Sequence, residues 1–237
     1  MSLTLSQFTL FNSSLNSLED KKLLITTLNA HSYNMARQNK HFALALQHSN
    51  VLLPDGISVV WAKRFLDGTQ LKKIAGADLF AYEMQRLNNS HGSCLFLGSS
   101  EQTLQLIKTK ANKAYPNVLA HTYSPPYKEQ FSKEDNALMI EAVNSLQPDV
   151  LFIGMTAPKQ ELWAYEQFAK LNTKHICCIG AVFDFYAGTI KRAPTWMISL
   201  GLEWLFRLLA EPKRLWKRYL IGNFKFIYFI LKEKCFS

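Results

Sequence analysis

The chain has 237 residues, of which 48% are apolar, so it can fill a sizeable core, and wholesale disorder is excluded. Its four cysteines include no CxxC pair, and Cys177 and Cys178 lie side by side in an apolar run, which predicts buried thiols in a reducing compartment. The formal net charge is +9. Residues 191–237 contain ten Lys or Arg and three Glu, so this segment carries +7 of that charge. The uneven distribution indicates an anionic partner for the segment: a membrane surface, a diphosphate or nucleic acid.

Short apolar runs alternate with longer helix-like stretches along most of the chain. Six runs are predicted as strands: LLITTL (23–28), NVLLPD (50–55), SCLFLG (93–98), NVLAHTY (117–123), DVLFIG (149–154) and HICCIGAVF (175–183). The stretches between them, such as AHSYNMARQNKHFALALQHS (30–49), are predicted as helices. Strands separated by helices of roughly 10–15 residues indicate βαβ units. We therefore expect a Rossmann-like α/β fold, with a mostly parallel sheet and helices on both faces.

The predicted strands stop before RAP (192–194), and the remaining sequence is helical in character. We therefore expect an α/β core over residues 1–190 and a basic helical appendage over residues 191–237, and we expect the core to bury its sheet without the appendage. No run reaches about 18 uninterrupted apolar residues, so no transmembrane helix is expected. The opening MSLTLSQFTLFNSS has no basic start and no long apolar stretch, so we expect no signal peptide.

The basic side chains of the last helical stretch gather on one side. At about 100° per residue, four of them fall within about 140° of one another: Lys213, Arg214, Lys217 and Arg218. Leucine, tryptophan and tyrosine fill the opposite arc. The pattern fits an ordinary surface helix packed on the core or an interfacial helix on anionic lipid, and the aromatic content and one-sided charge favour the second.

Several well-known motifs are missing from the sequence. It contains neither GxGxxG nor GxxxxGK[ST], which excludes the dinucleotide fingerprint and the P-loop. It also lacks HExxH, clustered histidines and the DxD pair that often holds a metal–nucleotide diphosphate. A nucleotide site in this chain must therefore use backbone amides, helix dipoles and basic side chains.

LLPDGISVVWA (52–62) places Asp55 at the C-terminal end of a predicted buried strand. Ligands in open parallel sheets bind outside those strand ends. Pro-Asp-Gly is also typical of a turn that leads into a helix, so two interpretations stay open. In the functional one, Asp55 is a carboxylate beside a cleft, available as a general base.

Two further junctions carry polar candidates with open interpretations. In TTLNAH (26–31), Thr27 and Asn29 either cap a helix or present a hydroxyl and an amide to a ligand. In LKKIAGADLF (71–80), Lys73 is one of two lysines that are either solvated or face an anion.

GMTAPKQELW (154–163) is a more specific pattern. Pro158 suits the first turn of a helix, whose free N–H groups attract an anion, and Gln160 adds a donor beside them. In IGAVFDFYAGTIKRAP (179–194), Asp184 lies among apolar and aromatic neighbours. A buried aspartate needs partners, so it either braces loop backbone or contacts a ligand.

These motifs together resemble the WecG/TagA/CpsF family of bacterial glycosyltransferases. The matching pieces, in chain order, are TLN (27–29), LPDG (53–56), GADL (76–79), APKQE (157–161), FDFYAG (183–188), RAP (192–194) and GLEWLFRLLAEPKRLWKRY (201–219). The resemblance implies that a sugar is transferred from a UDP-sugar to a sugar carried on a polyprenyl diphosphate. Enzymes of the family use N-acetylmannosamine, its uronic acid or glucose, and N-acetylmannosamine is favoured here. The resemblance also implies inversion at the anomeric carbon, no metal or other cofactor, and a membrane-associating appendage that completes the site.

Carried over to this chain, the resemblance makes Asp55 the catalytic base and places Thr27 and Gln160 in the active pocket. The family commonly has Arg where this chain has Lys73, and a lysine offers a point charge in place of a bidentate contact. The full set of predicted substrate-binding residues is Thr27, Asn29, Lys73, Gln160, Asp184, Arg192, Arg207, Arg214 and Arg218.

The expected partners are the UDP-sugar donor, the lipid-linked acceptor and, through residues 195–237, an anionic membrane surface. We therefore expect a cytoplasmic enzyme on the inner face of the bacterial plasma membrane, in cell-surface polysaccharide biosynthesis, and a homo-oligomer is compatible with the sequence. One alternative is a non-enzymatic nucleic-acid-binding protein. Such a protein binds the bases of the nucleic acid on an exposed sheet or with a recognition helix, whereas the predicted strands of this chain are buried. The other is a nicotinamide-dependent oxidoreductase, which lacks its glycine-rich fingerprint here.

Overall fold

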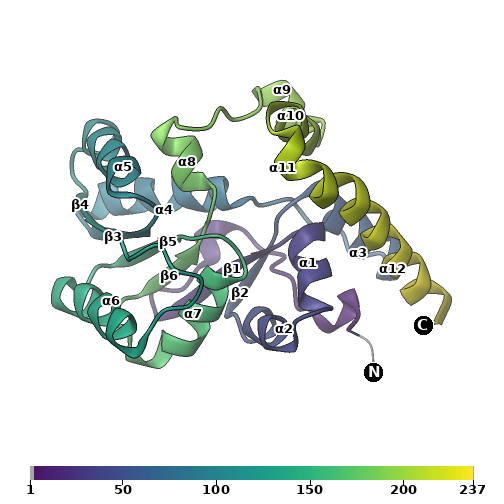
Figure 1. Ribbon diagram of the computed structural model, residues 1–237, viewed down its shortest axis with the longest axis horizontal. Helices are drawn as coiled ribbons and strands as arrows, with labels where there is room; N and C mark the ends of the chain where they lie inside the picture. Colours follow the sequence, from purple (N-terminus) through teal and green to yellow (C-terminus); the bar gives the residue numbers. More distant parts are fainter. Residues whose placement is uncertain (1–2, 237) are drawn as a thin grey trace.

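A single six-stranded sheet forms the centre of the computed structural model, which describes residues 3–236 (Figure 1). All neighbouring strands run parallel, in the order β2-β1-β6-β5-β3-β4. The strands are β1 Leu23–Leu28, β2 Val51–Pro54, β3 Ser93–Gly98, β4 Leu119–Tyr123, β5 Val150–Gly154 and β6 His175–Cys178. Each of the six predicted runs contains one of them, so the predicted α/β fold is confirmed.

Helices cover both faces of the sheet. They are α1 Ala30–Ala36, α2 Lys40–Gln47, α3 Ile57–Asp67, α4 Gly76–Ser90, α5 Glu101–Ala114, α6 Lys133–Leu146, α7 Lys159–Gln167, α8 Val182–Ala187, α9 Thr195–Ser199, α10 Glu203–Ala210, α11 Pro212–Trp216 and α12 Gly222–Phe236. Helices α4, α5 and α8 pack on one face and α6 and α7 on the other (Figure 1). The central strands are buried between these layers, which removes the exposed sheet that the nucleic-acid alternative requires.

The predicted stretch 30–49 and the predicted strand run 175–183 differ clearly from the observed elements. The stretch 30–49 is two helices: α1 ends at Ala36, and Asn39 begins α2 as its N-cap by accepting a hydrogen bond of 3.0 Å from the Phe42 N–H. The run 175–183 is a strand only to Cys178. Gly180 has a positive φ of 52°, which turns the chain out of the sheet, and α8 begins two residues later.

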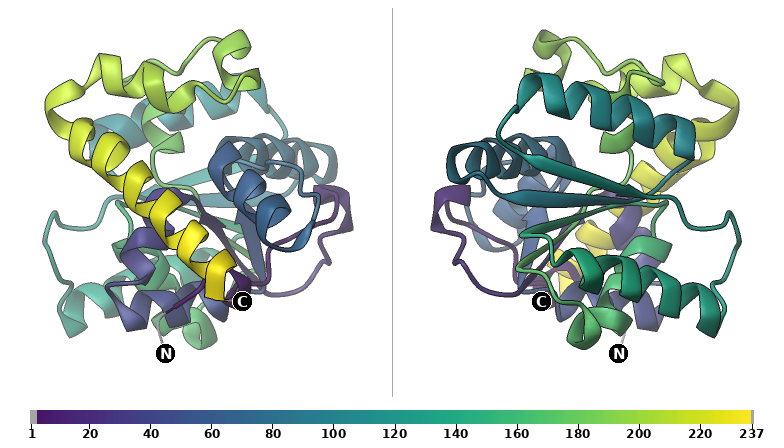
Figure 2. Two further views of the ribbon diagram at one scale, coloured as in Figure 1. Left: turned by 90° about the vertical axis from the view of Figure 1, so that its right-hand side faces the viewer. Right: turned by 90° about the vertical axis from the view of Figure 1, so that its left-hand side faces the viewer.

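The C-terminal tail is helical, as predicted, and it returns to the core. Helix α11, a π-helical turn (η4, Lys217–Ile221) and α12 follow one another without a break and cross the molecule diagonally (Figure 2). Phe226 and Ile230 of α12 are buried in a cluster with Tyr33, whose ring centroid lies 5.4 Å from that of Phe226. The predicted boundary near residue 190 lies between α8 and α9, but the sheet core and the tail share this cluster.

The N-terminal segment also holds the tail in place. The Glu233 carboxylate accepts hydrogen bonds from the Leu5 N–H at 2.6 Å and from the Ser6 N–H and hydroxyl at 2.9 and 2.6 Å. Because Glu233 is buried, these charge-assisted bonds fix both segments. Within residues 3–236, every helix is too short or too polar to cross a bilayer.

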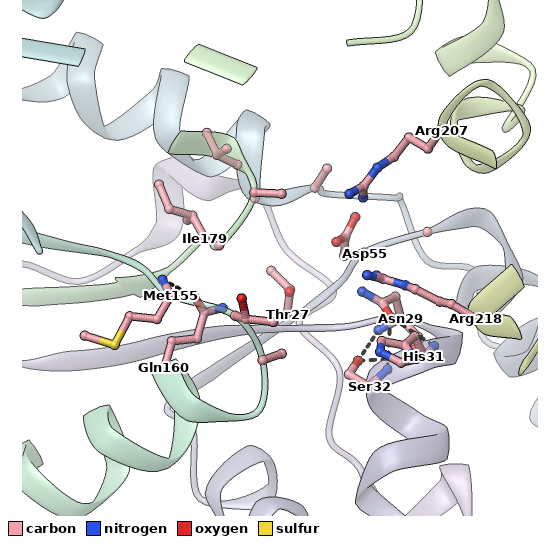
Figure 3. A pocket seen from close by; sticks show the side chains of 18 of the residues that line it. Thr27, Asn29, His31, Ser32, Asp55, Met155, Gln160, Ile179, Arg207 and Arg218 are labelled. Atoms are coloured by element: carbon pink, nitrogen blue, oxygen red, sulfur yellow. Dashed lines mark hydrogen bonds between the residues drawn. The ribbon is translucent and has the colours of Figure 1, made fainter. Parts of the chain in front are cut away.

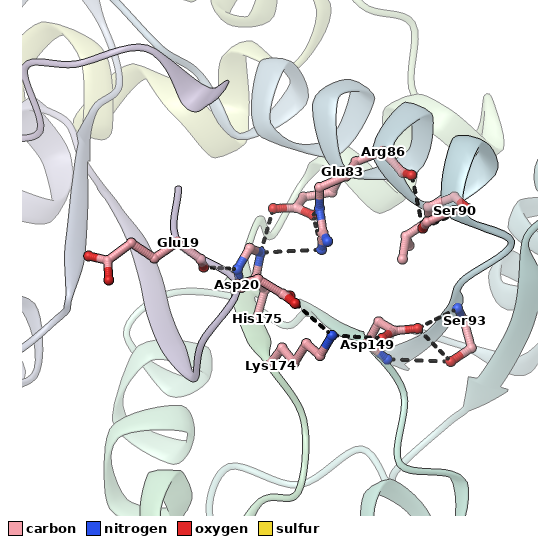
Figure 4. Close-up of polar contacts among 10 residues, drawn as sticks. Glu19, Asp20, Glu83, Arg86, Ser90, Ser93, Asp149, Lys174 and His175 are labelled. Carbon is pink, nitrogen blue, oxygen red and sulfur yellow. Dashed lines mark hydrogen bonds and ion pairs between the residues drawn. The ribbon is translucent and has the colours of Figure 1, made fainter. Parts of the chain in front are cut away.

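A buried polar cluster closes the amino-terminal edge of the sheet (Figure 4). His175, the first residue of β6, has Nδ1 2.7 Å from a Glu83 carboxylate oxygen and Nε2 3.0 Å from the Glu19 carbonyl oxygen. Arg86 lies 2.8 Å from the other Glu83 oxygen. The cluster therefore joins α4, β6 and the N-terminal segment at the edge opposite to the carboxyl ends of the strands.

Candidate active site

One cleft of about 1670 Å³ opens at the carboxyl ends of the strands, between the sheet and the C-terminal tail. Parallel strands direct all their carboxyl ends to the same edge, so residues far apart in sequence meet there. The ten predicted site residues all line this cleft: Thr27, Asn29, Asp55, Lys73, Gln160, Asp184, Arg192, Arg207, Arg214 and Arg218. Their grouping is observed, and the roles assigned to them stay predictions.

Asp55 follows β2 directly, and its N–H donates to the Leu28 carbonyl at 2.9 Å, which extends the β1–β2 pairing by one residue. Gly56 has a φ of 113°, a backbone angle that side chains rarely adopt, and this turn directs Asp55 into the cleft. Burial, followed by the nearby Glu203 carboxylate, raises the pKa of Asp55 to about 6, while Lys73 and Asn29 oppose the shift. A carboxylate with that pKa is ionised at neutral pH yet basic enough to accept a proton.

Of the two interpretations that the sequence left open for Asn29, the structure confirms capping, and contact with a ligand stays a prediction. Its Oδ1 accepts hydrogen bonds of 3.0 Å from the N–H groups of His31 and Ser32, so Asn29 is the N-cap of α1. With the oxygen held by the helix, the amide nitrogen is directed toward Asp55 (Figure 3), where a hydrogen bond from Asn29 opposes the rise in the pKa of Asp55. Thr27, two residues earlier on β1, presents its side chain to the same space.

Gln160 is buried, and internal hydrogen bonds fix its amide. Its Oε1 accepts from the Met155 N–H at 3.3 Å, and its Nε2 donates to a Glu161 carboxylate oxygen at 2.8 Å. The second Nε2 hydrogen is left for the cleft. Pro158 is the N-cap, so α7 begins at Lys159, one residue later than predicted, and the Lys159 ammonium binds away from the cleft centre, on the Lys128 carbonyl oxygen.

The four cleft arginines differ in their partners. Arg192 lies 3.5 Å from a Glu203 carboxylate oxygen, and Arg214 makes two hydrogen bonds of 2.6 and 2.7 Å to a neighbouring glutamate. Arg207 and Arg218 form no ion pair with any residue of 3–236, and Nε of each is buried without a hydrogen-bond partner. Both point toward Asp55 (Figure 3). They are therefore the two cleft arginines most available to an anionic ligand.

The π-helical turn η4 sets the position of Arg218. Such turns are rare and are frequent at functional sites, where they change which side of a helix a residue occupies. Burial lowers the pKa of the Arg218 guanidinium, and the Asp55 carboxylate is among the charges that act against the shift. A buried guanidinium with an open Nε gains a partner when a phosphate enters the cleft.

Asp184 and Lys73 occupy the rim of the site. Asp184 is half-buried in α8, and burial raises the pKa of its carboxyl. The Thr189 hydroxyl donates to the Asp184 carbonyl at 3.2 Å and approaches its carboxylate at 3.5 Å, so bracing of the loop accounts for part of its role. Lys73 acts on Asp55 as a nearby positive charge.

His31 and Glu161 line the cleft and lie inside quoted motifs, but neither was predicted as a site residue. His31 follows Asn29, and burial together with Arg218 lowers its pKa to about 4, so it is neutral. Glu161 is buried with Oε2 unpartnered, and burial raises its pKa to about 7. The available signal for each was its position at a strand-to-helix junction, one or two residues after a predicted site residue. Metal independence stays a prediction.

Comparison with known proteins gives consistent similarities. A family model described as "Glycosyl transferase WecG/TagA/CpsF family" matches residues 3–237. A Bacillus subtilis (strain 168) protein named N-acetylglucosaminyldiphosphoundecaprenol N-acetyl-beta-D-mannosaminyltransferase is 31% identical over 218 residues, which is 91% of this chain and 82% of the relative. Proteins with the same name from Bacillus spizizenii and from Staphylococcus aureus (strain MRSA252) are each 26% identical, over 91% and 90% of this chain and 81% of each relative.

Proposed function

Because the chain belongs to the WecG/TagA/CpsF family of glycosyltransferases, we propose that it transfers N-acetylmannosamine from a UDP-sugar to a polyprenyl-diphosphate-linked sugar. Transfer proceeds with inversion and without a metal ion. The names of the relatives, which specify an N-acetylmannosaminyl group and a diphosphoundecaprenol acceptor, support this choice of sugar and acceptor. Membership of a glycosyltransferase family replaces the nucleic-acid-binding and oxidoreductase alternatives.

The observation that carries the proposal is the Asp55 carboxylate at the end of β2, faced by two arginines without carboxylate partners. In the proposed reaction, Asp55 takes the proton from the acceptor hydroxyl as that oxygen attacks the anomeric carbon. The bond from the anomeric carbon to the β-phosphate oxygen breaks, and UDP leaves with the electron pair. One carboxylate is sufficient for this single displacement, which inverts the anomeric centre.

The departing UDP gains negative charge, so the site needs fixed positive groups. Arg207 and Arg218 meet this need, since preorganised cations stabilise charge that develops in the transition state. The Gln160 side-chain amide supplies a further donor. These groups make a metal ion unnecessary for leaving-group departure.

The C-terminal tail brings the enzyme to its lipid substrate in this proposal. Lys213 and Lys217 are exposed near the exposed rings of Trp216 and Phe224, which suits a peripheral helix at an anionic headgroup surface. Because α12 is buried against α1, removal of residues 195–237 uncovers core side chains, and we no longer expect that truncation to leave a folded core. Substitution of Lys213 and Lys217, followed by liposome flotation, tests membrane binding without this loss.

The proposed function is tested with a panel of labelled UDP-sugars and a synthetic polyprenyl diphosphate that carries N-acetylglucosamine. We expect a labelled lipid product with UDP-N-acetylmannosamine, and at most weak product with UDP-glucose. Transfer from another donor at equal or higher kcat/KM would replace the proposed sugar. Absence of a lipid product with every donor would overturn the proposed reaction.

A further inference from the structure

The end of the cleft farthest from the strands is apolar. Its walls come from two helices, with Trp61 and Phe65 on α3 and Ile227 and Leu231 on α12. Each pair has i,i+4 spacing, so each forms one ridge along its helix. The buried Phe226 and Ile230, each one residue before a wall residue of α12, also line the cleft. We call Trp61, Phe65, Ile227 and Leu231 the apolar groove.

A contact at the far end holds the two walls together. The Lys234 ammonium, near the end of α12, donates to the Leu66 carbonyl of α3 at 2.8 Å and lies 5.8 Å from the Phe65 ring centroid. The helices lie side by side in the fold (Figure 1). The two helices that form the groove are therefore connected to each other, which keeps its four side chains in a fixed arrangement.

The four groove side chains are between 50% and 66% exposed. Single exposed apolar residues are ordinary on protein surfaces, but a contiguous group of large ones marks a surface where a protein, a membrane or an apolar ligand binds. Exposure of these apolar side chains to water is unfavourable, so their burial against a hydrocarbon chain stabilises the complex.

The groove is continuous with the cationic part of the cleft. Arg218 and Leu231 belong to the same uninterrupted helix, thirteen residues apart, so the helix places them about 20 Å apart along its axis. A ligand that extends from the arginines into the groove thus needs an anionic head joined to an apolar chain of that length. A polyprenyl diphosphate has this combination.

We propose that the apolar groove binds the first isoprene units of the lipid-linked acceptor. The inference rests on the proposed function, because it needs the diphosphate of the acceptor to lie in the cationic part of the cleft, next to the UDP whose departure Arg207 and Arg218 assist. In this arrangement the first part of the chain leaves the bilayer and lies between α3 and α12. The terminal sugar then reaches Asp55 while the rest of the lipid stays in the membrane.

A competing occupant is the bilayer itself, into which exposed apolar side chains could insert without any groove. The same helix supplies a control for this alternative. Phe224 and Tyr228 of α12 are 74% and 58% exposed, and neither lines the cleft. Membrane insertion would use these outward side chains at least as much as the groove, whereas an isoprenoid bound in the groove would not contact them.

The test measures transfer in solution, without detergent or vesicles, to N-acetylglucosamine diphosphates that carry an isopentenyl or a farnesyl chain. The groove predicts a kcat/KM on the order of tenfold higher for the farnesyl acceptor, the effect expected for burial of about one apolar side chain. Trp61→Ser and Leu231→Ser should abolish this preference and leave transfer to the isopentenyl acceptor within about twofold. Phe224→Ser and Tyr228→Ser should keep the preference, and thermal unfolding checks that all four variants fold.

Several results overturn the groove while the proposed function stands. One is equal kcat/KM for both chain lengths in the parent protein, and another is equal loss of the preference in the Phe224 and Tyr228 variants. A dimer that buries Trp61 in solution, detected by its dissociation in Trp61→Ser, would assign the groove to a second copy of the chain. If no acceptor is turned over, the proposed function fails, and calorimetric titration with farnesyl diphosphate against inorganic diphosphate decides the groove separately: tighter binding of farnesyl diphosphate supports it, and equal binding overturns it.

Discussion

Replacement of Asp55 by asparagine should stop transfer and stabilise the fold at the same time. Loss of a general base typically lowers turnover about 10²–10⁴-fold. The stability effect follows from the pKa of the same group. Burial and the Glu203 carboxylate raise the pKa of Asp55 from 3.8 to about 6, so the folded protein holds its proton more tightly than the unfolded chain does.

The sign and size of the stability effect follow from this difference. Above pH 6 the carboxylate is charged in both states, and the folded state carries a cost of about 3 kcal/mol at 1.36 kcal/mol per pKa unit. Below pH 3.8 both states are protonated and the cost vanishes. Since asparagine is always neutral, Asp55→Asn should raise the free energy of unfolding at pH 8. The gain should shrink as pH falls through 6. Asp55 is partly open to the cleft, so 3 kcal/mol is an upper bound.

Urea unfolding at pH 8 and at pH 4, together with a transfer assay, measures both effects. Asp67→Asn is a control of opposite sign. Hydrogen bonds from Lys63 and Thr69 lower the pKa of Asp67 to about 2, so its removal should destabilise the protein at pH 8. In the parent enzyme, kcat/KM should fall below about pH 6 as Asp55 is protonated. Transfer by Asp55→Asn within threefold of the parent, or lower stability than the parent at pH 8, would refute this account.

Three further predictions test the surroundings of Asp55. Arg207→Gln and Arg218→Gln should each lower kcat about 10²–10³-fold, whereas Arg214→Gln, whose guanidinium already binds a glutamate, should cost far less; equal losses in kinetic assays would contradict the distinction. EDTA should leave transfer unchanged, and restoration of an EDTA-treated enzyme by Mg²⁺ or Mn²⁺ would show that the metal-free reaction is wrong. Glu83→Gln should lower the free energy of unfolding by about 3 kcal/mol, because it breaks a buried ion pair, and should leave kcat/KM unchanged, because the cluster lies at the opposite edge of the sheet; urea titration and a transfer assay check the two parts.

The sheet could be predicted because its strands are short apolar runs between helices. A parallel strand buried on both faces needs apolar side chains at every position, which gives a signal that local turns do not obscure. The ends of the strands were harder to predict. The strand run through Val182 and Phe183 looked continuous, but Gly180 adopts a positive φ, and no apolar pattern reports a backbone angle.

The candidate site residues could be placed together because they follow strand ends, and parallel topology collects those ends at one edge. Their partners could not be predicted. Arg192 and Arg214 are paired with glutamates while Arg207 and Arg218 are not, and that difference depends on how the tail packs. Within α12, apolar side chains occur on almost every side of the helix, so the periodicity of that segment does not show that Phe226 faces the core.

The inner architecture of the tail also depends on the π-helical turn. An extra residue in that turn changes the phase of the helix, so a regular 100° step from residue 213 does not give the true direction of Arg218 or of the side chains after it. The sequence therefore predicted a basic amphipathic helix, but it could not predict which of its faces closes the cleft.

The anomeric configuration of the product tests the central claim most directly. The reaction of UDP-N-acetylmannosamine with the lipid-linked acceptor is followed by NMR from its first minutes, so that the first linkage formed is observed before any rearrangement. A single displacement assisted by Asp55 predicts a β-linked product from the α-linked donor, together with one UDP per linkage. An α-linked first product would contradict it, because retention requires a second displacement that one general base does not provide.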